Sequence, residues 1–117
     1  MEESGDVCML MTAVDSEAAA QTLAQGIVEA QLAACVQVLA MQSFYVWQGQ
    51  SRRDAEYLLL IKTRVALAPV IENFVRAHHP YEVPELLQVP VTAGSAAYLQ
   101  WLRAGTMGRE CAPRLYE

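Results

Sequence analysis

The first third of the chain shows two hydrophobic patterns that predict a strand followed by a helix. Residues Val7–Ala13 form a short, nearly continuous apolar run, which is typical of a strand covered on both faces. Asp15 or Ser16 can cap the helix that follows, because short polar side chains accept hydrogen bonds from free amides. The helix carries an apolar stripe at spacings of four, four and three residues, made of Ala19, Leu23, Ile27 and Ala30.

The middle of the chain predicts a long β-hairpin. Residues Cys35–Trp47 are rich in β-branched and aromatic side chains, which favour strands. Residues Gln48–Ser51 then supply a turn, and Ala55–Thr63 returns as a second, apolar strand. Because this hairpin is long, we expect its tip to extend beyond the cover that its own chain provides.

A second amphipathic helix is predicted after the hairpin. Its apolar stripe consists of Leu67, Val70, Ile71, Phe74 and Val75. Pro69 must lie in the first turn, where no amide donor is needed. The helix must end near His79, because the residue before Pro80 disfavours the α conformation.

One more strand and one more helix complete the pattern. Residues Pro84–Val91 have prolines near both ends, which favours a strand at the edge of a sheet. Ser95 can cap a final helix over Ala96–Ala104, and Gly105 is expected to end it. Residues 106–117 mix glycine, proline and charged residues, and we expect them to form a loose tail.

The order of these elements, βαββαβ plus a C-terminal helix, predicts a ferredoxin-like α+β fold. In that fold a four-stranded antiparallel sheet carries helices on one face. A chain of 117 residues is expected to form one domain, here residues 1–117 with a core at about 7–105. The hydrophobic share of 54% is high for a small monomer, so we expect a second subunit to cover the bare face of the sheet.

Charge and cysteine content exclude several classes of partner. The net charge is −5, and the single lysine and seven arginines are not clustered, which argues against binding to nucleic acid or to anionic membranes. The N-terminus is acidic, and no apolar run approaches the roughly 20 residues of a membrane span. Three cysteines without CxxC spacing indicate free thiols. We therefore expect a cytoplasmic protein.

Several segments resemble the CutA divalent-cation tolerance proteins in order and spacing. They are LAACVQV, FYVWQGQ, LLLIKT, HHPYEVPELLQVPVTAG and YLQWL, within a match from about Val7 to Arg103. The resemblance implies a ferredoxin-like subunit, a homotrimer similar in architecture to the PII signalling proteins, and a link to copper and other divalent cations. It implies no established enzymatic reaction, and the sequence shows no Ser-His-Asp pattern, HExxH motif or glycine-rich phosphate loop.

The resemblance also implies a set of copper ligands. These are two histidines before the Pro-Tyr pair, which His78 and His79 match, and a cysteine near the end of the first strand, where this chain has Met11. Adjacent histidines diverge by about 100° on a helix, so both cannot easily bind one ion from a regular element. For His79 we favour capping or packing; for His78 metal binding and a structural role are balanced.

Met11 and its neighbour Met9 share one face of a strand, and their thioether sulfurs can bind Cu(I) but suit Zn(II) poorly. Packing in the core is the alternative and the better explanation for both methionines. A cleft or subunit interface is the expected place for one carboxylate and four amphipathic aromatic residues. These are Trp47, Tyr81, Glu85, Tyr98 and Trp101.

Two functions follow from these observations. The first is a non-catalytic homotrimer that binds copper or related divalent metals and contributes to metal-ion homeostasis. The alternative is a PII-like sensor or assembly module that binds a small effector in clefts between subunits. The absence of a glycine-rich or basic phosphate loop counts against ATP as that effector.

Overall fold

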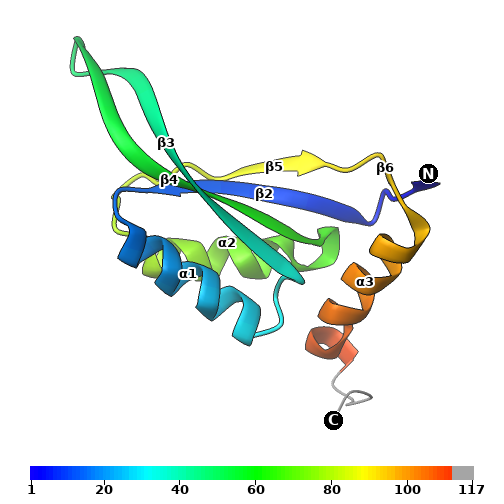
Figure 1. Ribbon diagram of the computed structural model, residues 1–117. Helices are drawn as coiled ribbons and strands as arrows, with labels where there is room; N and C mark the ends of the chain where they lie inside the picture. Colours follow the sequence, from blue (N-terminus) through cyan, green and yellow to red (C-terminus); the bar gives the residue numbers. More distant parts are fainter. Residues whose placement is uncertain (112–117) are drawn as a thin grey trace.

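The computed structural model describes the backbone of residues 1–111 and the side chains of residues 1–106. Four strands form the main sheet in the order β3-β4-β2-β5, and every neighbouring pair is antiparallel. They are β2 (Val7–Val14), β3 (Cys35–Trp47), β4 (Gln50–Arg64) and β5 (Leu87–Pro90). Helices α1 (Glu17–Glu29) and α2 (Ala68–His78) cover one face of the sheet (Figure 1). The predicted ferredoxin-like fold is therefore confirmed, with β5 at an edge as expected.

The core lies between the sheet and these two helices. Strand residues alternate between the faces, so Leu10 of β2 and Leu59 and Ile61 of β4 point toward the helices and are 3% exposed or less. The helices meet them with a second set of buried residues, which consists of Ala20, Leu23, Ile27, Ile71 and Val75. Burial of these apolar side chains is the main force that holds the helices on the sheet.

Helix α1 confirms the predicted start but corrects the predicted stripe. Of the two candidate caps, Ser16 is the one used, and its Oγ accepts a hydrogen bond from the Ala19 amide at 3.1 Å. Ala20 is buried in place of Ala19, which lies at the margin of the core. Ala30 is exposed, because the helix ends at Glu29 and Ala30 is its C-cap.

Helix α2 follows a short turn of 3-10 helix, η1 (Val65–Leu67), and has Pro69 in its first turn as predicted. It ends at His78, and His79 is already extended, with φ −79° and ψ 139°. Val70, expected in the core, is 37% exposed because Ile71 and Val75 define the face that packs on the sheet.

Helix α3 (Ala96–Cys111) runs through Gly105, so the predicted end of this helix is wrong. Thr106 explains the continuation: its side chain is fully buried, and its hydroxyl accepts a hydrogen bond from Arg64 Nε at 2.8 Å. This tertiary contact outweighs the low helix propensity of glycine. Residues 112–117 of the expected loose tail lie outside the described residues.

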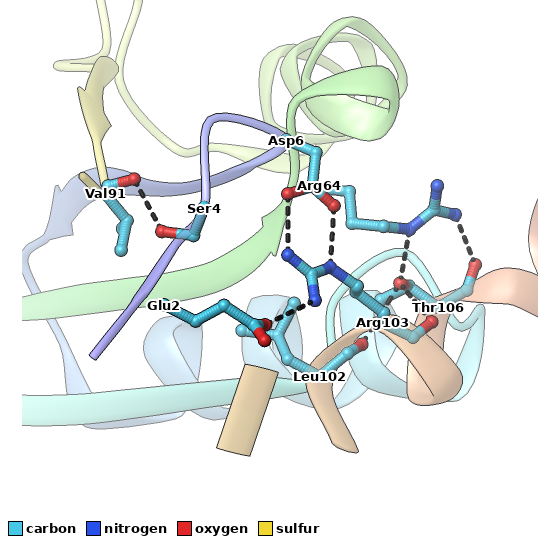
Figure 2. Close-up of polar contacts among 8 residues, drawn as sticks. All are labelled: Glu2, Ser4, Asp6, Arg64, Val91, Leu102, Arg103 and Thr106. Carbon is cyan, nitrogen blue, oxygen red and sulfur yellow. Dashed lines mark hydrogen bonds and ion pairs between the residues drawn. The ribbon is translucent and has the colours of Figure 1, made fainter. Parts of the chain in front are cut away.

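The N-terminal segment is fastened beside α3 by a small sheet that the sequence pattern does not reveal. Strand β1 (Glu2–Glu3) pairs with β6 (Ala93–Gly94), and both are only two residues long. Figure 2 shows the polar contacts that follow: Arg103 donates two hydrogen bonds to the Asp6 carboxylate, at 2.8 and 2.9 Å. The same end of the chain has a small apolar cluster, made of Val7, Leu99 and Leu102 with Ala34 and Val91 at its margin.

Neither α1 nor α2 covers the opposite face of the sheet (Figure 1), and α3 reaches it only at the end where β2 begins, where Val7 packs against Leu99 and Leu102. By strand register this bare face presents mostly apolar side chains, which are Met9, Met11, Leu39, Leu58, Leu60, Leu87 and Val89. None of them is fully buried, and Leu87 and Leu39 are 56% and 47% exposed. The expectation that this chain leaves a sheet face uncovered is confirmed for the part of the face beyond Val7.

Strands β3 and β4 extend well beyond the rest of the sheet as a two-stranded ribbon, here called the distal hairpin (residues 41–56). Strand β2 pairs with β4 only over Tyr57–Arg64, whereas β3 stays paired to β4 up to the turn. The turn is tighter than predicted, because Gln48 and Gly49 alone form it with φ angles of 53° and 76°. Within residues 1–111, no helix combines the length and apolar character needed to cross a membrane.

Candidate functional site

Both ring nitrogens of His79 make hydrogen bonds that hold the segment after α2 against the sheet. Its Nε2 lies 2.8 Å from the Ala13 carbonyl oxygen at the end of β2, and its Nδ1 lies 3.1 Å from the Tyr81 amide nitrogen. An amide can only donate and a carbonyl can only accept, so Nδ1 carries the lone pair and Nε2 the proton. Both ring nitrogens are thus occupied, and His79 performs the structural role favoured from the sequence.

His78 differs from its neighbour in one respect that matters for chemistry. Its Nδ1 lies 2.8 Å from the Phe74 carbonyl oxygen, and its ring stacks on Phe74 with centroids 4.3 Å apart. Because a carbonyl only accepts, the proton of the neutral ring is on Nδ1 and Nε2 has the lone pair. The side chain is exposed. His78 can therefore offer one nitrogen to a metal ion from solution.

Met11 does not join the histidines. It lies half-buried on β2 between Leu60 and Leu87, on the bare face of the sheet. His78 stacks on Phe74, which packs against the core on the helix-covered face. The sheet therefore separates the two predicted ligands. In the part of the chain that the structure describes, no group of three or more His, Cys, Asp or Glu residues is placed to hold a metal ion.

The two described cysteines do not add such a group. Cys8 is a free thiol, as the sequence predicted; it is buried on the helix-covered face, and burial raises its pKa, so it stays protonated. Cys35 is half-buried at the start of β3 and pairs with Lys62. The single chain thus offers His78 as an open ligand but not a complete metal centre.

A cavity of about 790 Å³ lies between the distal hairpin and residues 81–85. Three of the five residues predicted for a cleft or interface line it: Trp47 from the hairpin, and Tyr81 and Glu85 from the segment that His79 anchors. The volume is within the range of small-molecule sites, which is roughly 300–1,000 Å³.

Tyr81 links the two sides of this cavity. Its hydroxyl donates a hydrogen bond of 2.6 Å to the Glu56 carboxylate on β4, and its ring makes an edge contact with His79 at 4.8 Å between centroids. Burial, together with the Glu56 carboxylate, raises the pKa of the Tyr81 phenol far above its usual range. Tyr81 therefore remains a donor at any physiological pH, and the wall it forms keeps its geometry.

Other contacts fix the remaining walls. The Thr12 hydroxyl donates to the Glu85 carbonyl oxygen at 2.7 Å and so holds the backbone of that residue next to β2. On the hairpin, the Tyr45 hydroxyl donates to the Asp54 carboxylate. Arg52 also lines the cavity, opposite Tyr45 in the strand register.

Tyr98 and Trp101, the other two predicted cleft residues, lie elsewhere. Both are on α3, with ring centroids 5.6 Å apart, and Lys62 Nζ lies 5.7 Å from the Tyr98 ring centroid. They are 41% and 53% exposed, and neither lines the cavity. Their place at a subunit interface stays a prediction. The five predicted cleft or interface residues thus lie in two groups, one at each end of the sheet.

Sequence reasoning missed Glu56, Phe44, Tyr45 and Arg52 as cavity residues. The predicted second strand began at Ala55, five residues later than β4 begins, so the charged residues next to the turn were left unpaired. A signal for these residues was present in the sequence: aromatic residues alternate in β3 and charged residues alternate in β4. If the two strands are paired outward from a two-residue turn, Tyr45 lies beside Arg52.

Comparison with known proteins gives a consistent result. The family model described as CutA1 divalent ion tolerance protein matches residues 8–105. The divalent-cation tolerance protein CutA of Thermus thermophilus is 42% identical over 84% of this chain and 96% of its own length. Protein CutA of Homo sapiens is 41% identical over 87% of this chain, which spans 58% of that longer protein.

The solved structure of CutA from Synechococcus elongatus matches the fold described above. It superposes with a TM-score of 0.86 and 41% sequence identity, over 89% of this chain and 93% of that chain. The sheet order, the two helices on one face and the long hairpin are thus shared with a solved relative as well as indicated by sequence. This chain belongs to the CutA1 divalent-ion tolerance family.

Proposed function

We propose that this protein is a non-catalytic homotrimer that binds copper or a related divalent cation and contributes to metal-ion tolerance. The observation that carries the proposal is the geometry of His78. Its Nδ1 donates to the Phe74 carbonyl oxygen, which leaves Nε2 with the lone pair, and the side chain is exposed. Histidines that bind metals commonly donate their other ring nitrogen to a carbonyl or carboxylate, which fixes the tautomer and the ring orientation.

One imidazole is too few ligands for a resident metal centre. The cation is therefore cargo that binds and leaves, with its remaining ligands supplied by water or by another copy of the chain. Such exchangeable binding suits a protein that moderates a metal ion rather than one that uses it for catalysis. His79 is not among the proposed ligands, because both of its nitrogens are occupied.

The uncovered apolar surface supports the homotrimer. The bare face carries Met9, Met11, Leu60 and Leu87, and the distal hairpin exposes Phe44 and Val46 by 73% and 70%. Contiguous apolar surface of this kind is usually covered by another protein. A cytoplasmic location is part of the same proposal and rests on the cysteine spacing, which indicates free thiols.

The test is a calorimetric titration of Cu(II) and Zn(II) into the wild-type protein and the His78→Ala variant, with oligomeric mass measured by sedimentation. We expect His78→Ala to weaken binding of both ions at least tenfold, because it removes the only open imidazole among the described residues. The control Met11→Leu should leave both affinities unchanged, since a thioether suits neither ion well. Equal binding by wild type and His78→Ala, or a monomeric mass, would overturn the corresponding part of the proposal.

A second candidate function is the binding of a small effector, as in a PII-like sensor. The observation that favours it is the cavity of about 790 Å³ beside the distal hairpin, whose wall is fixed by the Tyr81–Glu56 and His79–Ala13 hydrogen bonds. A cavity with convergent polar groups and aromatic walls is a usual form for a small-molecule site.

A further inference from the structure

The cavity beside the distal hairpin has walls of two chemical kinds. Aromatic rings come from the hairpin, where Tyr45 and Trp47 share one face of β3 and line the cavity, and Tyr81 adds a third ring from the opposite side. Carboxylates form the second kind of wall, and they come from Glu56, Glu82 and Glu85.

The charges around the cavity do not balance. Three carboxylates face one guanidinium, that of Arg52, so the lining side chains carry a surplus of two negative charges. The hydrogen bond from Tyr81 satisfies one oxygen of Glu56 but leaves its charge in place, because a neutral phenol is the donor. Such a cavity repels anions and attracts cations.

The aromatic walls favour the same sign of charge. The face of an aromatic ring carries partial negative charge, and it attracts a cation that lies within about 6 Å of the ring centroid. Trp47, the strongest ring type for this interaction, is 55% exposed and so presents its surface to a ligand. Carboxylates and ring faces thus act together on one occupant.

The size of the cavity separates organic from inorganic cations. A divalent metal ion needs several ligand atoms within bonding distance, and among the described residues no group of three or more metal-ligating side chains is placed to supply them. A volume of about 790 Å³ instead fits a molecule with several non-hydrogen atoms.

We propose that this cavity binds a small organic cation, an amine or a quaternary ammonium compound, between the aromatic rings of the hairpin and the carboxylates of Glu56, Glu82 and Glu85. The inference rests on the second candidate function and names the chemical class of the effector. It does not depend on His78, which lies on α2 outside the lining of the cavity.

The wall that carries Glu56 and Tyr81 is formed before any ligand arrives. His79 fixes the segment to Ala13 of β2, and Tyr81 then reaches across to Glu56 of β4. Because these contacts are already made, binding a cation requires little ordering of this side of the site.

The test uses choline and two molecules of similar shape, measured by calorimetry on the full-length protein. One is the neutral isostere in which carbon replaces the nitrogen, and the other is the corresponding carboxylate. We expect choline to bind at least tenfold more tightly than the neutral isostere, and the carboxylate not to bind. Added salt should weaken choline binding, because it screens the carboxylates.

Two variants locate the site. We expect Glu56→Gln and Trp47→Leu each to weaken choline binding roughly three- to tenfold, through loss of a charge or of a ring face. In Glu56→Gln the new side-chain amide oxygen can still accept the Tyr81 hydrogen bond, so the wall is kept. The matched control Glu29→Gln, on an exposed residue at the end of α1, should leave binding unchanged.

Each other outcome has a distinct meaning. If the neutral isostere binds as tightly as choline, the cavity holds small molecules but the assignment to cations is wrong. If none of the three compounds binds, the inference is overturned, while the second candidate function, which names no chemical class, and the metal titration of His78→Ala are unaffected. If Trp47→Leu lowers the oligomeric mass and choline does not bind, a second copy of the chain occupies the cavity and the inference is overturned.

Discussion

The two ends of the main sheet are built in opposite ways. At the end where β2 begins, α3 and the N-terminal segment cover the strands, and Val7 is only 3% exposed. At the other end β3 and β4 continue alone, and Val46 in the distal hairpin is 70% exposed. Both valines lie in regular, paired strands. Backbone hydrogen bonds between β3 and β4 can therefore continue the two strands beyond the hydrophobic core, but they do not bury the side chains of those strands.

The covered end is completed by contacts within the chain. Figure 2 shows Arg103 bonded to Asp6, with Glu2 at 3.5 Å, and Arg64 bonded to Thr106, so each of these charged side chains has a partner. At the hairpin end, hydrogen bonds fix Tyr81 and Tyr45, but aromatic and carboxylate surface stays open around the cavity. This open surface of mixed chemistry is where the proposed partner or ligand would bind.

The largest expected difference between the two ends comes from replacing one valine at each. Val7→Ala should lower the free energy of unfolding by about 2 kcal/mol, through lost burial and an unfilled space. Val46→Ala should lower it by less than about 0.5 kcal/mol in the dissociated single chain, because its side chain is largely exposed there. Urea unfolding at several protein concentrations measures both. A larger Val46 effect that grows with concentration would place the hairpin tip in a subunit contact, whereas a large effect independent of concentration would contradict the comparison.

A smaller effect is expected from the buried hydroxyl at the covered end. Thr106→Val keeps the shape of the side chain but removes the acceptor for Arg64 Nε, and should cost about 1 kcal/mol. Thermal unfolding monitored by circular dichroism gives the change. Thr22→Val, on the exposed side of α1, is the matched control and should have almost no effect. If both variants behave alike, the Arg64–Thr106 contact does not hold α3 in place.

The smallest effect is expected from Asp6→Asn, and it should depend on pH. The Arg103 guanidinium lowers the pKa of the Asp6 carboxyl below its ordinary value of 3.8 in the folded protein. A lowered folded pKa stabilises the fold at pH values above the unfolded pKa, and this contribution is lost as the pH falls through the folded pKa. The difference in unfolding free energy between wild type and Asp6→Asn should therefore be constant from about pH 5 to 8, by the usual carboxyl range, and shrink below about pH 4. A difference that is unchanged at about pH 3 would mean that Asp6 acts through packing rather than charge.

The sequence alone predicted the features that depend on near neighbours. The cap at Ser16, the place of Pro69 in the first turn of α2 and the end of that helix before Pro80 all follow from local rules about free amides and allowed backbone angles. The order of the elements and the uncovered sheet face followed from periodicity in the same way. Resemblance to the CutA family added the trimer and the metal, which remain proposals.

The tertiary structure decided what distant residues do to one another. His79 is 66 residues from Ala13, whose carbonyl accepts the hydrogen bond from its Nε2, and Tyr81 is 25 residues from Glu56. These pairings are set by the register of the strands and the path of the chain after α2, which no local pattern specifies. The same reason explains why α3 continues past Gly105: Thr106 meets Arg64 across 42 residues of sequence. Local patterns thus determined the elements, and strand register determined which histidine stays open and where the cavity forms.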